Sequence, residues 1–296
     1  MAIISMTGFG RGEISENGVK VVVELSTVNR KQFDCNLSMP RELGCLEARL
    51  HALIHAEVSR GYVKGTVTLK TVPGSDGARF LNMELLKAQV AELREAAKLF
   101  NMIDDLGASA LLQLPDAMNT TVLFDQPEES WRLIEQATRQ ALKQLGQMRA
   151  HEGAALAADL RKRFGELKVL SEAIEPRAAA VPKQYQITLE KRLVDLLGVG
   201  AQGIIDPALL AREVALFADR CDVSEELTRL ASHFVQVVKV LEEGQASGRT
   251  LDFLCQEMFR EINTTGSKAN DAEITRMVIA FKAGLEAARE QIQNVE

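Results

Sequence analysis

Four side chains that could do chemistry recur at helical spacing in the segment 219–233, DRCDVSEELTRLASH. They are Asp222, Glu226, Arg229 and His233. At about 100° per residue, they fall within an arc of roughly 60° on one helical face. Carboxylates can hold a divalent cation, an imidazole can move a proton, and a guanidinium can bind a phosphate. The pattern therefore predicts one helix with a polar stripe suited to phosphate chemistry.

The same stripe has a simpler interpretation as a solvated face. Glu225 and Arg229 form an i, i+4 pair that would stabilise any exposed helix, and charged runs on helices commonly face water. An apolar stripe beside the charges would face the core. Its members are Val223, Leu227, Leu230, Phe234 and Val238. Residue spacing alone leaves both interpretations open.

A second polar stripe is expected in the segment 251–268, LDFLCQEMFREINTTGSK. One side of this helix would be apolar and face the core. The other side carries Asp252, Gln256, Arg260 and Asn263, with Glu257 and Glu261 beside them. This mixture of acids, amides and arginine differs from the lysine and glutamate that usually fill a solvated face. The sequence does not say whether the acids of the two segments meet in one site.

Composition places the chain among ordinary globular proteins. It has 296 residues, enough for about two domains, with 46% hydrophobic and 26% charged residues. The net charge of −6 excludes a generally basic surface, so a polyanion would need local cationic patches or bridging metal ions. Aromatic residues make up only 5%, which leaves few platforms for stacked bases.

The cysteines and the first residues predict a cytoplasmic protein. Cys35, Cys45, Cys221 and Cys255 form no C-x-x-C pair, and no histidine lies at zinc-ligand spacing, so reduced thiols are expected. The start, MAIISMTGFGRGE, lacks the basic region and the long apolar core of a signal peptide. No apolar run approaches 18 residues, so no membrane span is expected.

Residues 1–72 predict a β-β-β-α-β order. Three stretches before Pro40 alternate or are rich in β-branched residues, a helical pattern covers 41–59, and an alternating stretch follows from Tyr62. This order favours an antiparallel sheet with a helix across one face. The loop 26–31, STVNRK, holds an amide beside two cations and is either a phosphate-contacting loop or a polar turn.

The middle of the chain predicts a long helical arm. After a GSDG turn at 74–77, Asn82 would cap a helix that reaches about residue 101, and an irregular stretch follows. Residues 128–174 have helical apolar spacing, either as one very long helix or as two joined near Gly153. A turn over 176–182 and a helix over 183–197 would complete an antiparallel arm. Its exposed apolar stripe argues for an oligomer.

The last third predicts further helices, beginning at Pro207 and at about Asp271. The expected fold is α+β in three parts. A small antiparallel-sheet N-terminal domain covers 1–126, the helical arm covers 127–200, and an all-helical C-terminal domain carrying the polar motifs covers 201–296.

Several motifs resemble those of the YicC/YloC family of bacterial proteins. The last third carries DRCDVSEELTRLASH (219–233), GRTLDFLCQEMFREINTTGSKANDAEIT (248–275) and REQIQNVE (289–296). Upstream stand SMTGFGR (5–11), ELSTVNRKQFD (24–34), RGYVKG (60–65) and MRAHEGAALAADLRKR (148–163). The resemblance spans nearly the whole chain in order. The chain departs from the usual RSVN and NTLASK motifs at Ser26 and Gly266.

The resemblance implies a metal-dependent endoribonuclease that cleaves single-stranded RNA, uses Mn²⁺ or Mg²⁺, and assembles as a homo-oligomer, expected to be a hexamer. Residue roles do not come with it and are assigned by chemistry. Candidate metal ligands are Asp222, Glu226, Glu257 and Glu261. Catalytic candidates are Glu226, Arg229, Arg260 and His233, the last as metal ligand or general base. Candidates for RNA binding are Arg11, Arg30 and Lys268.

Two other classes of function remain open. A non-catalytic, oligomeric RNA-binding clamp or adaptor would use the same cations without a metal ion, and would tolerate loss of the acids. A purely structural helical assembly would show no salt-dependent RNA binding at all.

Overall fold

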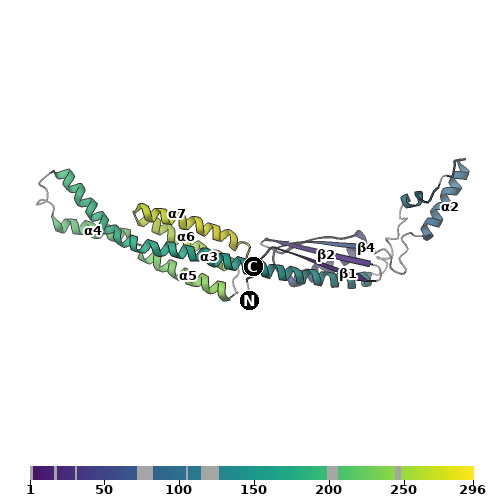
Figure 1. The fold of residues 1–296 in the computed structure, drawn as a ribbon, viewed down its shortest axis with the longest axis horizontal. Coiled ribbons are helices and arrows are strands. Elements are labelled where there is room, and N and C mark those ends of the chain that lie inside the picture. Colours follow the sequence, from purple (N-terminus) through teal and green to yellow (C-terminus); the bar gives the residue numbers. More distant parts are fainter. Residues whose placement is uncertain are drawn as a thin grey trace. The chain divides into compact units, whose positions relative to one another are not determined.

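The computed structural model describes residues 3–16, 19–30, 32–71, 83–104, 106–114, 127–198, 206–243 and 248–296. The chain forms two compact units, a sheet unit over 7–148 and a helical unit made of 1–6 and 149–296. Helix α3, Pro127–Leu197, contributes its first part to the sheet unit and the rest to the helical unit (Figure 1). These units differ from the three expected domains because most of α3 packs on other elements.

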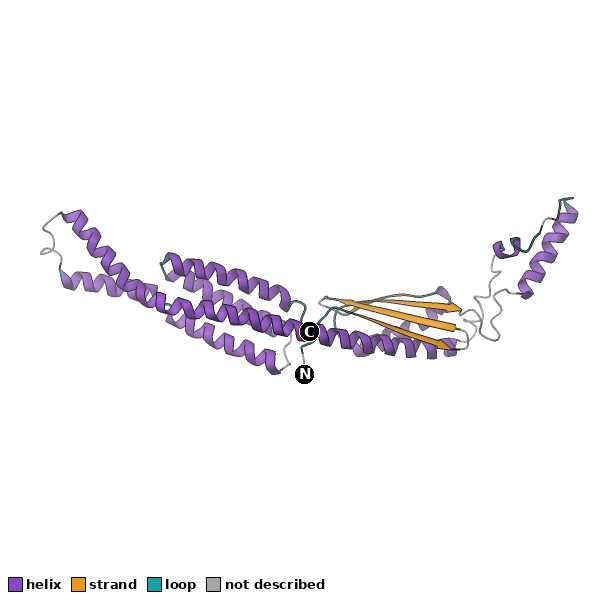
Figure 2. Ribbon diagram, viewed as in Figure 1, coloured by secondary structure: helices purple, strands orange, loops and turns teal. Residues whose placement is uncertain are grey.

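The sheet unit contains a four-stranded sheet in the order β1-β2-β4-β3. Its strands are β1 (Gly8–Glu16), β2 (Val19–Val28), β3 (Asp34–Ser38) and β4 (Tyr62–Thr71). Figure 2 draws strands of this sheet as orange arrows. The β1–β2 and β2–β4 pairs are antiparallel, as expected, but β3 pairs with β4 in parallel. The reason is the connection between them, because a strand-to-strand crossover through a helix returns the chain in the same direction. The α+β class is confirmed, and the sheet is mixed.

One face of the sheet packs on helices. The expected helix 41–59 is a 3-10 turn, η1 (Arg41–Leu46), followed by α1 (Glu47–Glu57). Val23 and Leu25 of β2 share a buried cluster with Leu50 of α1 and with Ala137 and Ala141 of α3. Alternation along β2 and helical spacing along α3 place these apolar residues in one core.

A separate helical segment follows the sheet in the chain. Helix α2, Met83–Leu99, matches the expected helix over 82–101, and a short 3-10 turn, η2, covers Ala110–Gln113. The expected turn at 74–77 and the cap at Asn82 lie outside the described residues.

Helix α3 runs without a turn through both of its prolines, so the predicted turn over 176–182 is wrong. Proline removes one intrahelical hydrogen bond and strains the helix. Here Ile174 and Val181, on either side of Pro176, are buried in the helical core and hold the helix in place. The end of α3 packs on α4, Pro207–Cys221, where Leu193 and Leu210 line a shared pocket.

The segment 219–233 is not one helix, because α4 ends at Cys221 and α5 begins at Ser224. Asp222 has extended backbone geometry, and its Oδ1 accepts the backbone N–H of Ser224 at 2.9 Å. An aspartate that satisfies a free N–H at a helix start competes with helix continuation. The predicted single helix is therefore wrong at Asp222.

The helical unit is built on α5 (Ser224–Glu243), α6 (Gly248–Lys268) and α7 (Ala272–Ile292), with the later part of α3. Phe164, Leu230, Met258 and Phe281 are buried in its core, one from each helix. The two chain ends are joined, because Ser5 bridges to Val295 and the buried guanidinium of Arg149 pairs with Glu296.

In the described part of the chain, no helix is both long enough and apolar enough to cross a membrane.

Candidate functional site between helices α5 and α6

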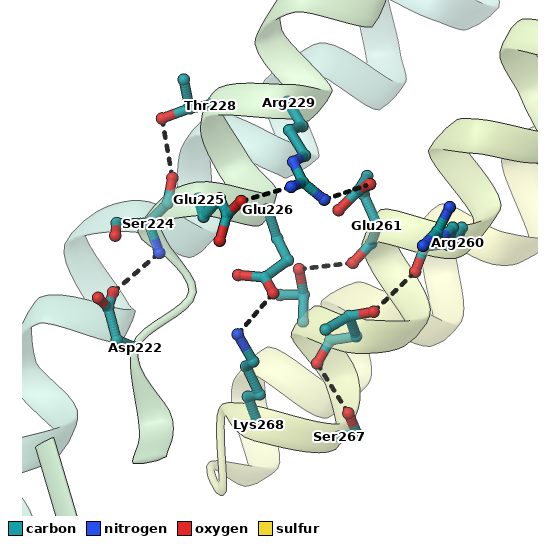
Figure 3. Close-up of polar contacts among 12 residues, drawn as sticks. Asp222, Ser224, Glu225, Glu226, Thr228, Arg229, Arg260, Glu261, Ser267 and Lys268 are labelled. Carbon is teal, nitrogen blue, oxygen red and sulfur yellow. Dashed lines mark hydrogen bonds and ion pairs between the residues drawn. The ribbon is translucent and has the colours of Figure 1, made fainter. Parts of the chain in front are cut away.

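A buried carboxylate of α5 holds an ammonium group of α6. The Nζ of Lys268 donates to Oε1 of Glu226 at 2.6 Å, across 42 positions of sequence (Figure 3). The Glu226 side chain is only 7% exposed, whereas that of Lys268 is 37% exposed. This hydrogen bond is the main reason that the pKa of Lys268 lies above its ordinary value, since the ammonium form is the one that it stabilises.

The second oxygen of Glu226 is unusual. Among the described residues, Oε2 is buried and has no hydrogen-bond partner. A buried carboxylate oxygen normally accepts a hydrogen bond, because losing water without replacement is costly. One carboxylate oxygen of Glu226 thus accepts a hydrogen bond from Lys268, and the other can still accept one.

A second ion pair joins the same two helices, but here α5 provides the cation and α6 provides the buried acid. Arg229 of α5 reaches Glu261 of α6, with Nη1 3.5 Å from Oε1 of Glu261. The Glu261 side chain is 5% exposed and that of Arg229 is 52% exposed. Arg229 also pairs with Glu225 one turn earlier, as the i, i+4 spacing predicted. Each helix therefore gives one buried acid and one partly exposed cation, and Figure 3 shows the two pairs between α5 and α6.

Asp222 lies at the edge of this cluster and not on its helical face. The backbone N–H and hydroxyl of Ser224 lower the pKa of Asp222, so the carboxylate stays ionised. Its negative charge also acts on Lys268, whose raised pKa it supports. Asp222 is thus an electrostatic neighbour of the site that also caps α5.

Three other predicted residues lie nearby in sequence without joining these ion pairs. Arg260 is exposed on α6, and among the described residues its guanidinium has no ion pair. Glu257 is one turn before Glu261 and half-buried. His233 lies one turn beyond Arg229, and its Nδ1 is buried without a partner in the described part of the chain. The structure therefore brings together Glu226, Arg229, Glu261 and Lys268.

The predicted RNA-binding residues Arg11 and Arg30 belong to the sheet unit. Both are exposed at the surface. Arg11 contacts Glu13 at 3.1 Å, and Arg30 pairs with Asp34 while its guanidinium lies 5.7 Å from the ring centroid of Tyr62. The loop containing Arg30 starts later than expected, since β2 continues to Val28 and includes Ser26.

The described residues do not form a ready metal centre. No group of three or more histidine, cysteine, aspartate or glutamate side chains is placed to hold a metal ion in the described ranges. The two buried acids are each paired with a protein cation, and of the predicted ligands Glu226 has one buried oxygen, Oε2, without a partner in the described ranges. The predicted ligand set of Asp222, Glu226, Glu257 and Glu261 therefore does not form a preformed metal site within the described ranges.

A model of the endoribonuclease YicC-like N-terminal region matches residues 3–158, and a model of the endoribonuclease YicC-like C-terminal domain matches residues 174–296. The chain belongs to the YicC-like endoribonuclease family. It is 36% identical over 293 residues to a protein of Clostridioides difficile named "Probable endoribonuclease YicC", covering 99% of each chain. A protein of the same name from Haemophilus influenzae is 29% identical over 298 residues, covering 99% of this chain and 100% of the relative.

This membership confirms the family suggested by the motifs. The boundary between the matched regions falls between 158 and 174, inside helix α3. All four residues that meet in the α5–α6 cluster belong to the C-terminal match.

Sequence reasoning missed two aspects of the helical unit. It assigned Lys268 to flanking RNA and did not foresee its pairing with Glu226, because only packing determines which helices face each other. It also missed a cavity between α3, the end of α4 and the start of α5, lined in part by Glu175, Ala178 and Pro182. The two prolines had predicted a turn in this part of the chain. The one sequence signal for a continuous helix was the run of helix-forming residues around the prolines.

Proposed function

We propose that this chain is an endoribonuclease whose active site lies between α5 and α6. The family membership supports RNA cleavage as the activity. One observation supports the location: two partly exposed cations from different helices are each held by a buried carboxylate of the other helix. Lys268 and Arg229 are those cations.

The two cations would bind the phosphate at the bond to be cleaved. Cleavage builds negative charge on the oxygens around phosphorus, and fixed positive charges stabilise that charge most when they need no rearrangement. Glu226 and Glu261 hold the ammonium and guanidinium groups in place before RNA binds. Arg229 can also make two parallel hydrogen bonds to one phosphate, and the exposed Arg260 would contact the same segment of RNA.

Proton transfer is assigned to Glu226, with His233 as the second candidate. Oε2 of Glu226 would accept the proton of the oxygen that attacks phosphorus, and would return it to the leaving oxygen as the bond between phosphorus and that oxygen breaks. His233 is seven residues further along α5, hence on the same helical face, and its Nδ1 is free within the described residues. Each role needs a group within hydrogen-bond reach of the bound RNA.

Single-stranded RNA is the proposed substrate, following the resemblance. Dependence on Mn²⁺ or Mg²⁺ remains a separate prediction. Assembly as a hexamer and a cytoplasmic location also remain predictions, tested by light scattering and by cell fractionation.

The central experiment is cleavage of an end-labelled single-stranded RNA by the Glu226→Gln variant. This change keeps the shape and removes the charge, so we expect cleavage to fall at least about 100-fold. Glu242→Gln is the matched control, because Glu242 is an exposed carboxylate on the same helix. The assay is run with Mn²⁺, with Mg²⁺ and with excess EDTA. Full cleavage by Glu226→Gln, at matched helicity and unfolding midpoint, would remove this site from the reaction.

A clamp that binds RNA without cutting it is the second candidate. It is favoured by the same cations and by the lack of a three-donor metal group among the described residues. It predicts salt-dependent RNA binding and no internal cuts in any metal. It also predicts that Lys268→Met weakens binding while Glu226→Gln does not.

A further inference from the structure

The four-stranded sheet has an outer face that the described helices of the sheet unit leave open. Leu25 of β2 points to the inner face, where it shares a buried cluster with residues of η1, α1 and α3. Side chains alternate along a strand, so the neighbours of such inner residues point outward. Ser26, Lys64 and Asn36 are outward residues of β2, β4 and β3, and the strand register places them in one row with Phe9 of β1. All four are exposed or half-buried.

One end of this outer face carries two aromatic rings. Phe9 is 47% exposed and Val28 is 49% exposed, which is unusual for large apolar side chains. Tyr62 is half-buried and lies directly opposite Val28, and Val28 is the diagonal neighbour of Phe9. Strand spacing and the rise per residue put the Cα atoms of Phe9 and Tyr62 roughly 12 Å apart. One base could not lie on both rings, so each ring offers a place for a separate base.

Two cations lie next to these rings. Lys64 follows Tyr62 by two positions on β4, so both side chains project from the outer face. Lys64 is exposed, and no ion pair joins its ammonium group to another described residue. The guanidinium of Arg30 lies 5.7 Å from the ring centroid of Tyr62 and pairs with Asp34. Lys64 is therefore available to an anion, and Arg30 adds positive charge beside it.

Positive charge also exceeds negative charge on the outer face as a whole. Among the described strand residues that point outward, with Arg30 beside them, there are five cations and three acids, namely Arg11, Lys20, Arg30, Lys64 and Lys70 against Glu13, Glu24 and Asp34. The complete chain carries a net charge of −6. A polyanion would therefore be attracted to this face more than to the average surface of the protein.

We propose that this end of the outer face binds a segment of single-stranded RNA, with one base stacked on Phe9, another on Tyr62, and a phosphate bonded to Lys64. Proteins that hold single strands with little regard to sequence combine aromatic rings, on which bases stack, with cations that bind the backbone. The sheet unit would thus hold the substrate by contacts that are separate from the α5–α6 cluster. RNA as the ligand rests on the proposed function, whereas the binding test needs no cleavage.

RNA fits this surface better than a second copy of the chain does. Among the described residues, the large apolar side chains exposed on the outer face are Phe9 and Val28. A stable contact between proteins buries roughly 800 Å² per partner, which is far more than two side chains can supply. The side chains on either side of Lys64 are Ser26 and Asn36, whose polar groups can bond to a sugar or to a base edge.

The first test measures binding of a short, fluorescently labelled oligouridylate to the full-length protein by anisotropy in excess EDTA, with a gel to show that the RNA stays intact. Phe9→Ala should weaken binding about tenfold, and Phe9→Tyr, which keeps a ring, should bind as the wild type does. Phe100→Ala is the matched control, because Phe100 is a 70% exposed phenylalanine of the same unit that follows α2 and lies outside the sheet. Equal binding by Phe9→Ala and Phe100→Ala would overturn the assignment.

The second test separates stacking on Tyr62 from its packing in the sheet. Tyr62→Leu keeps an apolar side chain on β4 but removes the ring, so RNA binding should fall about tenfold. Tyr62→Phe keeps the ring and should bind RNA as the wild type does. An equal loss of affinity in both variants, at matched unfolding midpoints, would mean that Tyr62 does not act by stacking and would overturn its role.

The third test separates charge from stacking. Lys64→Met should reduce the slope of log affinity against log salt by about one, because one phosphate contact is lost. Lys98→Met removes an exposed lysine of α2 and should leave the slope unchanged. Double-stranded RNA should compete at least about tenfold less well than the single strand, since its bases already stack on one another. Equal competition by the duplex would overturn the role of the two rings.

Cleavage assays on a long single-stranded RNA distinguish failure of this RNA-binding surface from failure of the proposed function. A raised KM with retained kcat in Phe9→Ala and Tyr62→Leu, together with loss of kcat in Glu226→Gln, supports both. If the wild type cuts RNA but neither ring variant changes binding or KM, the sheet surface fails and the nuclease stands. If no RNA is cut but binding depends on Phe9 and Tyr62, the nuclease fails and the sheet surface stands. A change in oligomeric mass in Phe9→Ala, without a change in RNA binding, would assign this surface to a contact between copies and overturn the proposal.

Discussion

The two units use the same helix, α3, in different ways. In the sheet unit, β1 comes so close to α3 that a Cβ on Gly12 would lie 1.8 Å from the carbonyl oxygen of Ala137. In the helical unit, large side chains such as Phe164 fill the space around α3. A strand can approach a helix backbone this closely only where the strand has glycine, because any side chain would collide with the helix. Between two helices, large side chains keep the backbones apart and pack into the grooves of the opposite helix. Helix α3 thus packs closely on a strand at Ala137 and packs on other helices through a large side chain at Phe164.

Charge is also used differently in the two units. In the sheet unit, Arg11 and its partner Glu13 are both exposed, and such pairs contribute little to stability. In the helical unit, Glu226 and Glu261 are buried and each needs its cation. A buried acid without a partner is costly, so these pairs fix the positions of Lys268 and Arg229. In the helical unit these buried ion pairs hold candidate functional side chains in place, whereas the exposed pair of the sheet unit mainly faces solvent.

The largest expected effect is in the helical core. Phe164→Ala should destabilise the helical unit by about 3–5 kcal/mol, because it leaves a cavity among large neighbours. Val169→Ala removes an exposed apolar side chain from the same helix and should cost far less. Native-state hydrogen exchange of amides in α5–α7 measures both. Equal effects of the two substitutions would contradict this packing.

The next effect tests the close approach in the sheet unit. Gly12→Ala should destabilise this unit by about 1–3 kcal/mol or more, since the methyl group would overlap the α3 backbone. Gly146→Ala lies on α3 in the same unit with open space around it, and should stabilise by about 0.5–1 kcal/mol. Urea unfolding with exchange of the β2 amides provides the measurement. A neutral Gly12→Ala would mean that β1 can move away from α3.

The third prediction compares two arginines. Arg229→Met leaves Glu261 buried without its cation and should cost about 1–2 kcal/mol, a value reduced because Arg229 is partly exposed. Arg11→Met breaks an exposed pair and should cost less than about 0.5 kcal/mol. Urea midpoints at low and high salt measure both. The proposed distinction in charge use fails if the two substitutions cost the same.

The smallest effect concerns acid stability at the start of α7. Arg177 donates to Asp271 at 2.8 Å, and this pair, with the N–H groups of Glu273 and Ile274, lowers the pKa of Asp271. Between the lowered pKa and the ordinary value of 3.8, the unfolded chain binds more protons than the folded one. Asp271 therefore stabilises the fold above about pH 3.8, and this contribution is lost as pH falls through the lowered value.

The measurement for this prediction is the unfolding midpoint between pH 2 and 6, for the wild type and for Asp271→Asn. The variant should be less stable near pH 6 and lose less stability as the pH falls. Asp195→Asn is the exposed control on α3. Parallel pH profiles for wild type and Asp271→Asn would show that this pair does not contribute.

Local elements were largely predictable because they depend on neighbours in sequence. Alternation found β2, helical spacing found α2 and α7, and Pro207 marked the start of α4 with Asp206 accepting from Ala208. The predictions failed where a local signal competed with the rest of the fold. The prolines of α3 predicted a turn that core packing prevented, and Asp222 fitted a helical stripe but serves as a cap.

The sequence by itself determined the family motifs and the α+β class. It also determined which chemical groups are available, namely acids, arginines and a lysine, in a chain without an excess of positive charge. Only the tertiary structure decided which of them meet. Glu226 pairs with Lys268, which lies 42 positions away in the sequence, and Arg229 pairs with Glu261, which lies 32 positions away. Spacing along one helix fixes a face through the 3.6-residue turn, but the opposing residue depends on how two helices pack. The α5–α6 cluster therefore depends on the contact between the two helices, and neither helix alone determines it.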